Sequence, residues 1–365
     1  MYFYQKELDA LKKADRLRTR KIFNKNLIDL ASNDYLGLSS KKKLLKKAYK
    51  IVKKDKFNSS KASPLVNGYS NIHKKFEKLL CKINNFENGI CLGSGFLANI
   101  GLIESLIRKK DILFIDQEYH ASGILATNLI QDKVIFFEHN DYKDLETKIK
   151  ENQINNTQRV VIAIEGIYSM SGDIAPKQFN TIALKYNAIL IVDEAHSSGV
   201  IGKNLLGWFD YHNIKIKPNH IKMGTLGKAY GSYGAYILAS NHIVSYLENR
   251  AKALIYSTAI STFDIALAYI NLQYIIKHKK KLKTKIYKFH NLVYKKLSIK
   301  TVSLILPIII DDNKKVLQIQ SNLLQKGYLI GAIRQPTVKK AILRVILKLD
   351  ISKKKLKKIL NYLKN

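Results

Sequence analysis

The strongest constraint on the fold is a series of short, uninterrupted apolar runs that alternate with helical stretches. The clearest runs span residues 112–115, 134–137, 160–164 and 189–192. Runs of this length between polar turns are typical of strands that are buried on both faces of a sheet. Because the strands alternate with helices, we predict an α/β fold with a mainly parallel sheet.

Small or chemically reactive residues follow each of these runs, at positions 116–122, 138–140, 165–173 and 193–199. Ligands of parallel sheets bind at the carboxyl ends of the strands. The sequence therefore predicts one site that is assembled from several strand ends.

The pattern changes after Ser240. Residues 243–285 are mainly helical in pattern, and strand-like runs follow at 303–310, 328–333 and 343–349 before a last helix near 356–363. A chain of 365 residues exceeds the usual size of one domain. We predict an N-terminal arm over residues 1–40, a large domain over 41–240 that carries the site, and a smaller C-terminal α/β domain over 241–365.

The formal net charge is +35, and most of it comes from lysine. Clustered basic residues can bind nucleic acid because they neutralise phosphates. Here the lysines are scattered as well as clustered, and no nucleic-acid-binding motif accompanies them. We therefore expect a solvated surface and no specific nucleic-acid partner, with a field that can steer an anionic substrate.

No stretch approaches the roughly 20 apolar residues that span a bilayer, and the N-terminus lacks the apolar core of a signal peptide. These features predict a cytoplasmic protein without a membrane partner. The two cysteines, Cys81 and Cys91, have no zinc-ligand spacing, so we expect core packing and no metal site.

Lys228 lies in the glycine-rich segment GTLGKAYG, residues 224–231. Flanking glycines bring a lysine close to backbone and limit its solvation, which lowers an amine's pKa and makes it a usable nucleophile. The hydroxyl of Thr225 can reach a phosphate beside this lysine. A phosphate-binding loop is the alternative, but its motif requires Ser or Thr after the lysine, where this chain has Ala229.

Asp193 and His196 follow another apolar run, within the letters DEAH. The same letters form the metal-binding box of a helicase family, but no phosphate-binding loop precedes them here. A buried acid beneath a heterocycle is the favoured interpretation. An ionised Asp193 keeps a pyridine nitrogen protonated, and His196 can donate to the phenolic oxygen of the same ring.

Three further segments fit a phosphorylated heterocycle. Residues 93–99 open a helix with small residues, whose free N–H groups bind phosphate. His120 follows the run at 112–115, where an imidazole can stack on a flat ring, and Ser169 follows the run at 160–164. Each has a plainer explanation when taken alone, as a helix cap, a structural histidine or a solvated serine.

Taken together, these segments resemble the α-oxoamine synthase family of fold-type I pyridoxal-phosphate enzymes. The resemblance runs from about Ala14 to Leu349, and its motifs occur in the family's order. They are NDYLGL at 33–38, GYS at 68–70 with His73, SGF at 94–96, DEAH at 193–196, TLGK at 225–228 and YST at 256–258. The resemblance implies a fold-type I α/β transferase with pyridoxal phosphate as its cofactor.

The resemblance also implies roles for the matching residues. Lys228 would hold the cofactor as a Schiff base and move the substrate's α-proton. Asp193 would pair with the pyridine nitrogen, His196 with the ring hydroxyl, and His120 would stack over the ring. The phosphate and its surroundings would be held by Gly95, Phe96, Thr225 and Ser169. Family members are homodimers, so Ser257 and Thr258 are expected to reach the partner's cofactor.

Residues 14–20 and 332–338 are similar to the branch of the family that condenses L-alanine with a pimeloyl thioester in biotin synthesis. The acyl group would arrive on coenzyme A or on an acyl carrier protein, and carbon dioxide would leave. In that branch Arg18 would meet the acyl substrate and Thr337 would line its channel. The amino-acid carboxylate would be held by Arg344 with Arg334, and Asn33 is also expected at the substrate.

The chain departs from the family pattern at Lys61 and Pro64, where members usually have Gly or Ser. Segments 23–29 and 339–341 are also shorter than usual. Two alternatives therefore stay open. One is the same chemistry with glycine and acetyl- or succinyl-coenzyme A, as in glycine C-acetyltransferase and 5-aminolevulinate synthase. The other is a non-catalytic basic binding protein or subunit on the same fold.

Overall fold

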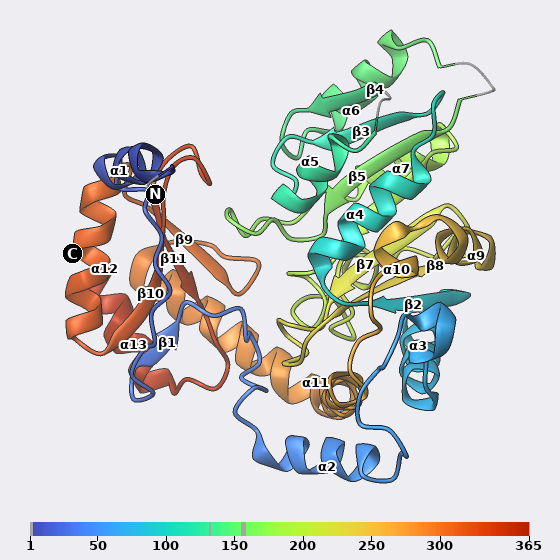
Figure 1. Cartoon of the computed structure of the whole chain (residues 1–365). Helices are drawn as coiled ribbons and strands as arrows, with labels where there is room; N and C mark the ends of the chain where they lie inside the picture. Colours follow the sequence, from blue (N-terminus) through green and yellow to red (C-terminus); the bar gives the residue numbers. More distant parts are fainter. Residues whose placement is uncertain (1–2, 131–132, 155–157, 365) are drawn as a thin grey trace. The chain divides into compact units, whose positions relative to one another are not determined.

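The computed structural model describes residues 3–130, 133–154 and 158–364. The chain divides into two compact units. The large unit comprises Leu36–Ser169 and Asp173–Thr284, and the small unit comprises Met1–Tyr35, Met170–Gly172 and Lys285–Asn365. The long helix α11 (Thr262–Leu297) contributes residues to both units (Figure 1).

The large unit is built on a seven-stranded sheet with the order β2-β8-β7-β6-β5-β3-β4. Strand β8 is antiparallel to β2 and β7, and the other neighbours pair in parallel. The strands are β2 (Asn88–Leu92), β3 (Ile112–Asp116), β4 (Lys133–Phe137), β5 (Val160–Glu165), β6 (Ile189–Asp193), β7 (His220–Thr225) and β8 (Ala235–Ala239). The predicted α/β fold with a mainly parallel sheet is confirmed.

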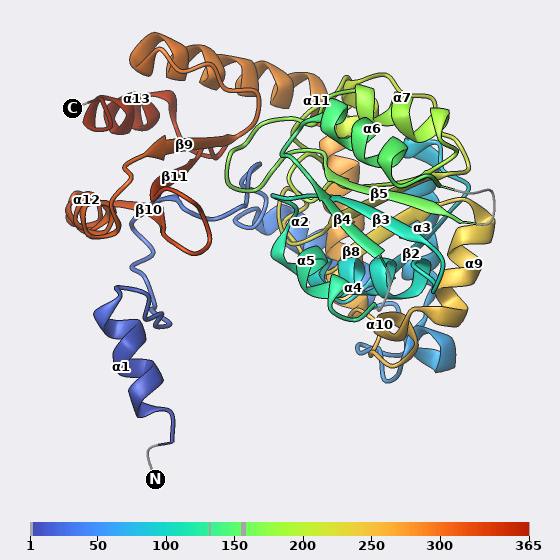
Figure 2. The ribbon, with the colours of Figure 1, turned by 90° about the horizontal axis from the view of Figure 1, so that it is seen from above.

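Helices cover both faces of this sheet, which explains the continuous apolar runs. In Figure 2, α6 (Tyr142–Glu151) and α7 (Gln178–Lys185) lie on one side, and α4 (Gly95–Leu106) and α5 (Ala121–Thr127) on the other. Every residue of β3 and β5 is buried. Strands β3, β5 and β6 each end in a buried carboxyl group, which belongs to Asp116, Glu165 or Asp193.

The large unit contains further short and long helical elements outside this sheet. They are α2 (Lys42–Val52), η1 (Pro64–Gly68), α3 (Asn71–Asn84), α8 (Trp208–Tyr211), α9 (Asn241–Arg250) and α10 (Lys252–Ile255). Helix α3 begins with a capping box, in which the side chains of Ser70 and His73 satisfy backbone N–H groups.

The small unit contains a four-stranded sheet with the order β1-β10-β11-β9. Its strands are β1 (Ile28–Leu30), β9 (Ile305–Ile309), β10 (Tyr328–Ile333) and β11 (Ile342–Ile346), and its helices are α1 (Gln5–Lys13), α12 (Asn313–Gln325) and α13 (Lys353–Tyr362). Strand β1 pairs in parallel with β10. Residues 28–30 therefore complete a sheet whose other three strands come from the C-terminal part of the chain.

Both cysteines are free; Cys91 is buried in β2 and Cys81 is partly buried. Within the described part of the chain, no helix combines the length and the apolar character that crossing a membrane requires. The same residues contain no group of three or more potential metal ligands.

Candidate active site

Lys228 follows strand β7, and His196 follows the adjacent strand β6. The Nζ atom of Lys228 lies 2.8 Å from Nε2 of His196. His196 is buried and Lys228 is half-buried. One of these nitrogens donates a hydrogen bond to the other, and the contact holds the Lys228 amine at the strand ends.

Asp193 is fixed by donors on both carboxylate oxygens. Its Oδ2 accepts from Nδ2 of Asn99 at 2.9 Å, and its Oδ1 accepts from the backbone N–H of Ala195 at 2.9 Å. The residue is only 3% exposed. The two hydrogen bonds fix the orientation of this buried carboxylate.

Asn99 was not assigned a role from the sequence, although it lies in the segment at 93–99. Its Oδ1 accepts from the hydroxyl of Tyr119 at 2.8 Å, so its Nδ2 must face Asp193. The sequence signal is a polar residue inside the apolar first half of helix α4.

His120 caps helix α5 and contacts Ser122 with Nδ1, at 2.7 Å from the hydroxyl oxygen. Burial lowers the pKa of His120, Asp193 opposes this shift, and Lys228 adds to it. The imidazole thus lies within electrostatic range of both Asp193 and Lys228. Because its pKa is lowered, it is neutral at neutral pH and can present an uncharged flat face.

Glu165 is a second residue that sequence reasoning missed. It ends β5 in register with Asp193 on β6 and is 1% exposed. Burial raises its pKa well above the usual 4.5, and the Asp193 charge adds to the increase. Its Oε1 atom has no hydrogen-bond partner among the described residues. The raised pKa favours the protonated form of the Glu165 carboxyl group.

Glu194, between Asp193 and His196, has a structural role. It is fully buried, accepts from the backbone N–H of Trp208 at 2.6 Å and lies 3.5 Å from Nζ of Lys222. The carboxyl group of Glu194 therefore makes its polar contacts within the core, as a buried polar group requires.

The start of α4 lies beside Thr225. A Cβ atom placed at Gly95 would be 3.7 Å from the Cβ of Thr225, so the glycine leaves a small cradle there. Ser94 caps the helix by accepting from the N–H of Leu97 at 3.2 Å. The hydroxyl of Thr225 already donates to the carbonyl of Gly234 at 3.0 Å. The cradle suits a phosphate, which backbone N–H groups at the helix start can bind.

Other residues expected near the cofactor are less enclosed, apart from Ser169, which is buried in the loop after β5. Phe96 and Thr258 are exposed, and Ser257 is half-buried.

All five residues expected to bind substrate lie in the small unit. Arg344, on β11, is 6% exposed, and its Nη1 donates to Oδ1 of Asn33 at 3.0 Å. The exposed Arg18 donates to the hydroxyl of Thr337 at 3.4 Å. Arg334 donates to the backbone carbonyl of Asp15. The structure therefore forms two pairs, Asn33–Arg344 and Arg18–Thr337.

A further polar cluster in the large unit was not predicted. His139 lies between Asp116 and Asp173, with each ring nitrogen 3.0 Å from a carboxylate oxygen. Burial lowers the pKa of His139, but hydrogen bonds to Asp116 and Asp173 outweigh this and raise it to about 10. The cluster joins the end of β3 to the residues that follow Ser169.

Residues 25–363 match the family model described as aminotransferase class I and II. The chain belongs to this family. The 8-amino-7-oxononanoate synthase of Helicobacter pylori is 45% identical over 361 residues, which cover 99% of this chain and 96% of that protein. The resemblance to α-oxoamine synthases is therefore confirmed.

Solved structures give the same result. The 8-amino-7-oxononanoate synthase from Francisella tularensis is 29% identical, with a TM-score of 0.76 and coverage of 93% of this chain and 98% of that chain. A serine palmitoyltransferase from S. paucimobilis, solved with bound PLP and myriocin, is 20% identical, with a TM-score of 0.88 and coverage of 99% and 95%. The second likeness shows the fold, which is fold-type I.

The chain is a transferase of a pyridoxal-phosphate-dependent family, and pyridoxal phosphate is its cofactor. The residues present fit this group. The cradle at Gly95 suits its phosphate, Lys228 offers an amine to its aldehyde, and Asp193 offers a fixed carboxylate to its ring nitrogen.

Proposed function

We propose that the chain is an 8-amino-7-oxononanoate synthase, which condenses L-alanine with a pimeloyl thioester and releases carbon dioxide in biotin synthesis. The observation that carries this proposal is the contact of Lys228 with His196, together with Asp193, whose carboxylate accepts two hydrogen bonds. It occurs in a chain that is 45% identical to an enzyme of that name along nearly its whole length.

Bound pyridoxal phosphate supplies an electron sink, which stabilises the carbanion left when an amino acid loses its α-proton. Lys228 then accepts and returns that proton, because an amine held at the strand ends is in place as a general base. Asp193 keeps the ring nitrogen protonated, and Asn99 holds the carboxylate in the orientation that this requires. His196 holds the ring hydroxyl, and the neutral His120 stacks on the ring.

The start of α4 and Thr225 hold the phosphate, with Phe96 and Ser169 around it. Arg344 binds the carboxylate of alanine, since a guanidinium matches a carboxylate with two parallel hydrogen bonds. Its hydrogen bond to Asn33 orients it before the substrate arrives. Arg334 assists, and Arg18 and Thr337 meet the acyl chain.

The proposal includes a homodimer that works in the cytoplasm, without a nucleic-acid partner. Ser257 and Thr258 reach the partner's cofactor. The exposure of Tyr256, at 80%, supports an interface here, because large aromatic side chains are enriched in such surfaces.

The first test measures cofactor binding. Purified protein loaded with pyridoxal phosphate should absorb visible light, and Lys228→Ala should abolish the lysine-bound absorption band and turnover. Lys217→Ala, a change of an exposed lysine in the same unit, is the control and should keep both. If the wild type shows no such band, the cofactor assignment is wrong.

The second test identifies the substrates. The wild type should release coenzyme A from pimeloyl-coenzyme A with alanine, and much more slowly from acetyl- or succinyl-coenzyme A with glycine. The reverse preference would assign one of the related synthases. Tight nucleic-acid binding at physiological salt with no turnover of any pair would favour a non-catalytic protein.

A further inference from the structure

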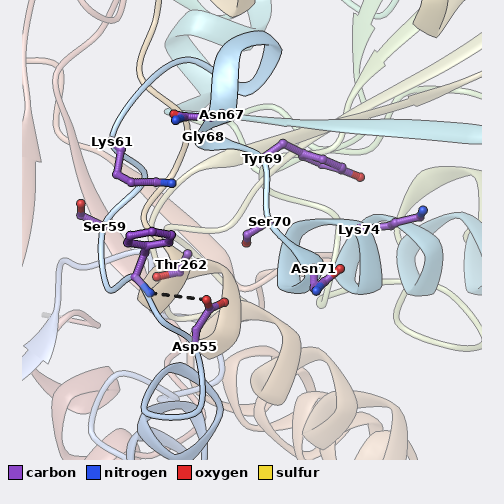
Figure 3. A pocket seen from close by; sticks show the side chains of 11 residues that line it. Asp55, Ser59, Lys61, Asn67, Gly68, Tyr69, Ser70, Asn71, Lys74 and Thr262 are labelled. Carbon is purple, nitrogen blue, oxygen red and sulfur yellow. Dashed lines mark hydrogen bonds between the residues drawn. The ribbon is translucent and has the colours of Figure 1, made fainter.

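A cavity of about 450 Å³ opens in the large unit, and none of its lining residues belongs to the candidate active site. Its wall is formed by the loop between α2 and η1, the first turn of α3 and the start of α11. Figure 3 shows Lys61 and Ser59 on one side of the cavity, with Asn71 and Lys74 of α3 on the other. We call it the Lys61 pocket.

The charges around the Lys61 pocket favour an anion. Two lysines, Lys61 and Lys74, line it, against one aspartate, Asp55. In the part of the chain that the structure describes, neither lysine has an ion-pair partner. The ammonium of Lys61 lies 3.9 Å from the ring centroid of Phe57. Asp55 accepts from the N–H of Phe57 at 3.5 Å, and its single negative charge leaves the lining with a net positive charge.

Thr262 is an independent sign of a ligand. It lines the cavity and is 3% exposed, and its hydroxyl has no hydrogen-bond partner among the described residues. A buried hydroxyl without a partner is costly, so an acceptor at this wall would satisfy it. The first turn of the 14-residue helix α3 adds the positive end of the helix dipole and the N–H groups of Asn71 and Ile72, which its capping box does not use.

The backbone at Lys61 also points to a function for its side chain. Its φ of +64° lies in the left-handed region, which favours glycine. The loop is fixed there, because Ala259 donates to the carbonyl of Ala62 at 3.0 Å, and a Cβ at Gly68 would be 2.1 Å from that oxygen. A lysine in a conformation that favours glycine points to a use for its ammonium group.

Two hydrogen bonds connect the Lys61 pocket to the proposed active site. Ser232, four residues after Lys228, donates to the carbonyl of Asp264 in the first turn of α11 at 2.6 Å. Ala259, whose N–H bonds Ala62, directly follows Ser257 and Thr258. The lining of the pocket is therefore continuous with the segments that carry the cofactor residues.

We propose that the Lys61 pocket binds an anionic group of the acyl donor. This rests on the proposed function, because a pimeloyl thioester carries a free carboxylate at the end of its acyl chain and phosphate on its carrier. Both groups present anionic oxygens that ammonium and hydroxyl groups bind. Lys61 and Lys74 thus determine donor affinity, and they take no part in the proton transfers.

Two variants test the pocket. Lys61→Gly removes the ammonium and suits the left-handed backbone, so it should fold at least as well as the wild type. Lys74→Ala removes the second charge. Each should raise the KM for pimeloyl-coenzyme A by about three- to ten-fold, with kcat changed by less than about two-fold. The KM for alanine should stay the same.

Matched controls separate charge from backbone effects. Lys75→Ala removes an exposed lysine next to Lys74 that does not line the cavity. Asn213→Gly places glycine at another exposed left-handed position, with φ +51°. Both should leave the donor KM unchanged. If Lys61→Gly and Lys74→Ala behave like these controls, the proposal is overturned.

Three donors identify the bound anion: pimeloyl-coenzyme A, its terminal methyl ester, and the N-acetylcysteamine thioester of pimelate, which lacks phosphate. If the Lys61→Gly defect disappears with the methyl ester, the pocket binds the acyl carboxylate. If it disappears with the N-acetylcysteamine thioester, the pocket binds carrier phosphate. An equal defect with all three donors would mean that the pocket recognises neither anion and would overturn the proposal.

Calorimetric titration of the cofactor-loaded protein with coenzyme A and with pimelate separates this proposal from the proposed function. If the wild type turns over none of the donors, the function fails, and the titration still decides on the pocket. Weaker binding of either anion by Lys61→Gly supports the pocket. Equal binding, or no binding by the wild type, overturns it.

Discussion

The polar groups of the strand ends in the large unit differ from the substrate-binding candidates of the small unit in how they are held. Asp193 is buried and receives two hydrogen bonds of 2.9 Å, one of them from a side chain that is itself fixed by Tyr119. Arg18 is exposed and makes one hydrogen bond of 3.4 Å to Thr337. Arg344 lies between these extremes, because it is buried and has a side-chain partner.

This difference indicates separate roles for the two sets of residues. The groups that we propose to act on the cofactor are positioned before any ligand binds, which is the arrangement that electrostatic catalysis requires. Of the groups that we propose to bind the substrate, Arg18 is held more loosely and Arg344 more firmly. We therefore expect substitutions in the large unit to lower kcat, and substitutions in the small unit to raise KM.

The largest expected effect belongs to Asp193→Asn. The amide cannot hold the ring nitrogen protonated, so kcat should fall by about 10²- to 10⁴-fold. The cofactor should still bind through Lys228, and absorption spectra and steady-state kinetics measure both properties. A kcat within a few-fold of the wild type would show that the fixed carboxylate is not needed.

Arg344→Lys should have the next largest effect, on the affinity for alanine. Lysine keeps the charge but loses the planar pair of donors, so the KM for alanine should rise by about 10- to 100-fold. Arg18→Lys, at the exposed pair, should change the KM for the acyl donor by no more than about five-fold. Equal effects at the two arginines would contradict the difference in how they are held.

His139→Gln should weaken the large unit in a pH-dependent way. The folded pKa of about 10 exceeds the usual 6.5, so the stabilisation by His139 is complete below about pH 6.5 and is lost as the pH rises toward 10. At pH 6 the variant should lose about 2 to 4 kcal/mol of unfolding free energy.

Urea denaturation of wild type and His139→Gln at several pH values checks this expectation, and their midpoints should converge near pH 10. Lys143→Gln, an exposed change near His139, serves as the control. A difference that stays constant from pH 6 to pH 10 would mean that the imidazole is uncharged in the folded protein.

Glu165→Gln should have the smallest effect on activity, within about three-fold, because glutamine resembles the protonated acid. Its effect on stability should be opposite in sign to that of His139→Gln. Since the folded pKa of Glu165 is raised above 4.5, the unfolded chain releases a proton that the folded protein keeps, and this opposes folding increasingly as the pH rises. The variant should therefore gain stability over the wild type by up to about 1.4 kcal/mol per pH unit above about pH 5.

Urea midpoints at pH 5 and pH 8 measure this gain. A large loss of activity, or a stability difference that does not change with pH, would show that Glu165 is ionised.

Much of the fold could be predicted because buried parallel strands leave continuous apolar runs. The runs at 112–115, 134–137, 160–164 and 189–192 correspond to β3, β4, β5 and β6, which differ from them by at most one residue at either end. The run at 328–333 is β10, whereas the run at 343–349 gave a strand that ends earlier, at Ile346. Short sequence motifs likewise indicated Lys228, Asp193 and His196 as candidate site residues.

The missed residues depend on strand order, which local patterns do not contain. Glu165 faces Asp193 only because β5 and β6 are neighbours, and His139 reaches Asp116 and Asp173 only because β3 lies between β4 and β5. The direction of a hydroxyl is also set by its surroundings. The Thr225 hydroxyl donates to the carbonyl of Gly234, so it must turn away from this carbonyl to donate to a phosphate.

The pairing of β1 with β10 has a consequence for how the protein is made. Synthesis reaches residues 28–30 before their partner strand, because Tyr328–Ile333 follows about 300 residues later in the chain. At about 5 to 20 residues per second, the first strand waits roughly 15 to 60 seconds for its partner. During that interval the backbone groups of residues 28–30 lack the strand that they pair with, and a chain that ends before residue 328 never forms this pairing.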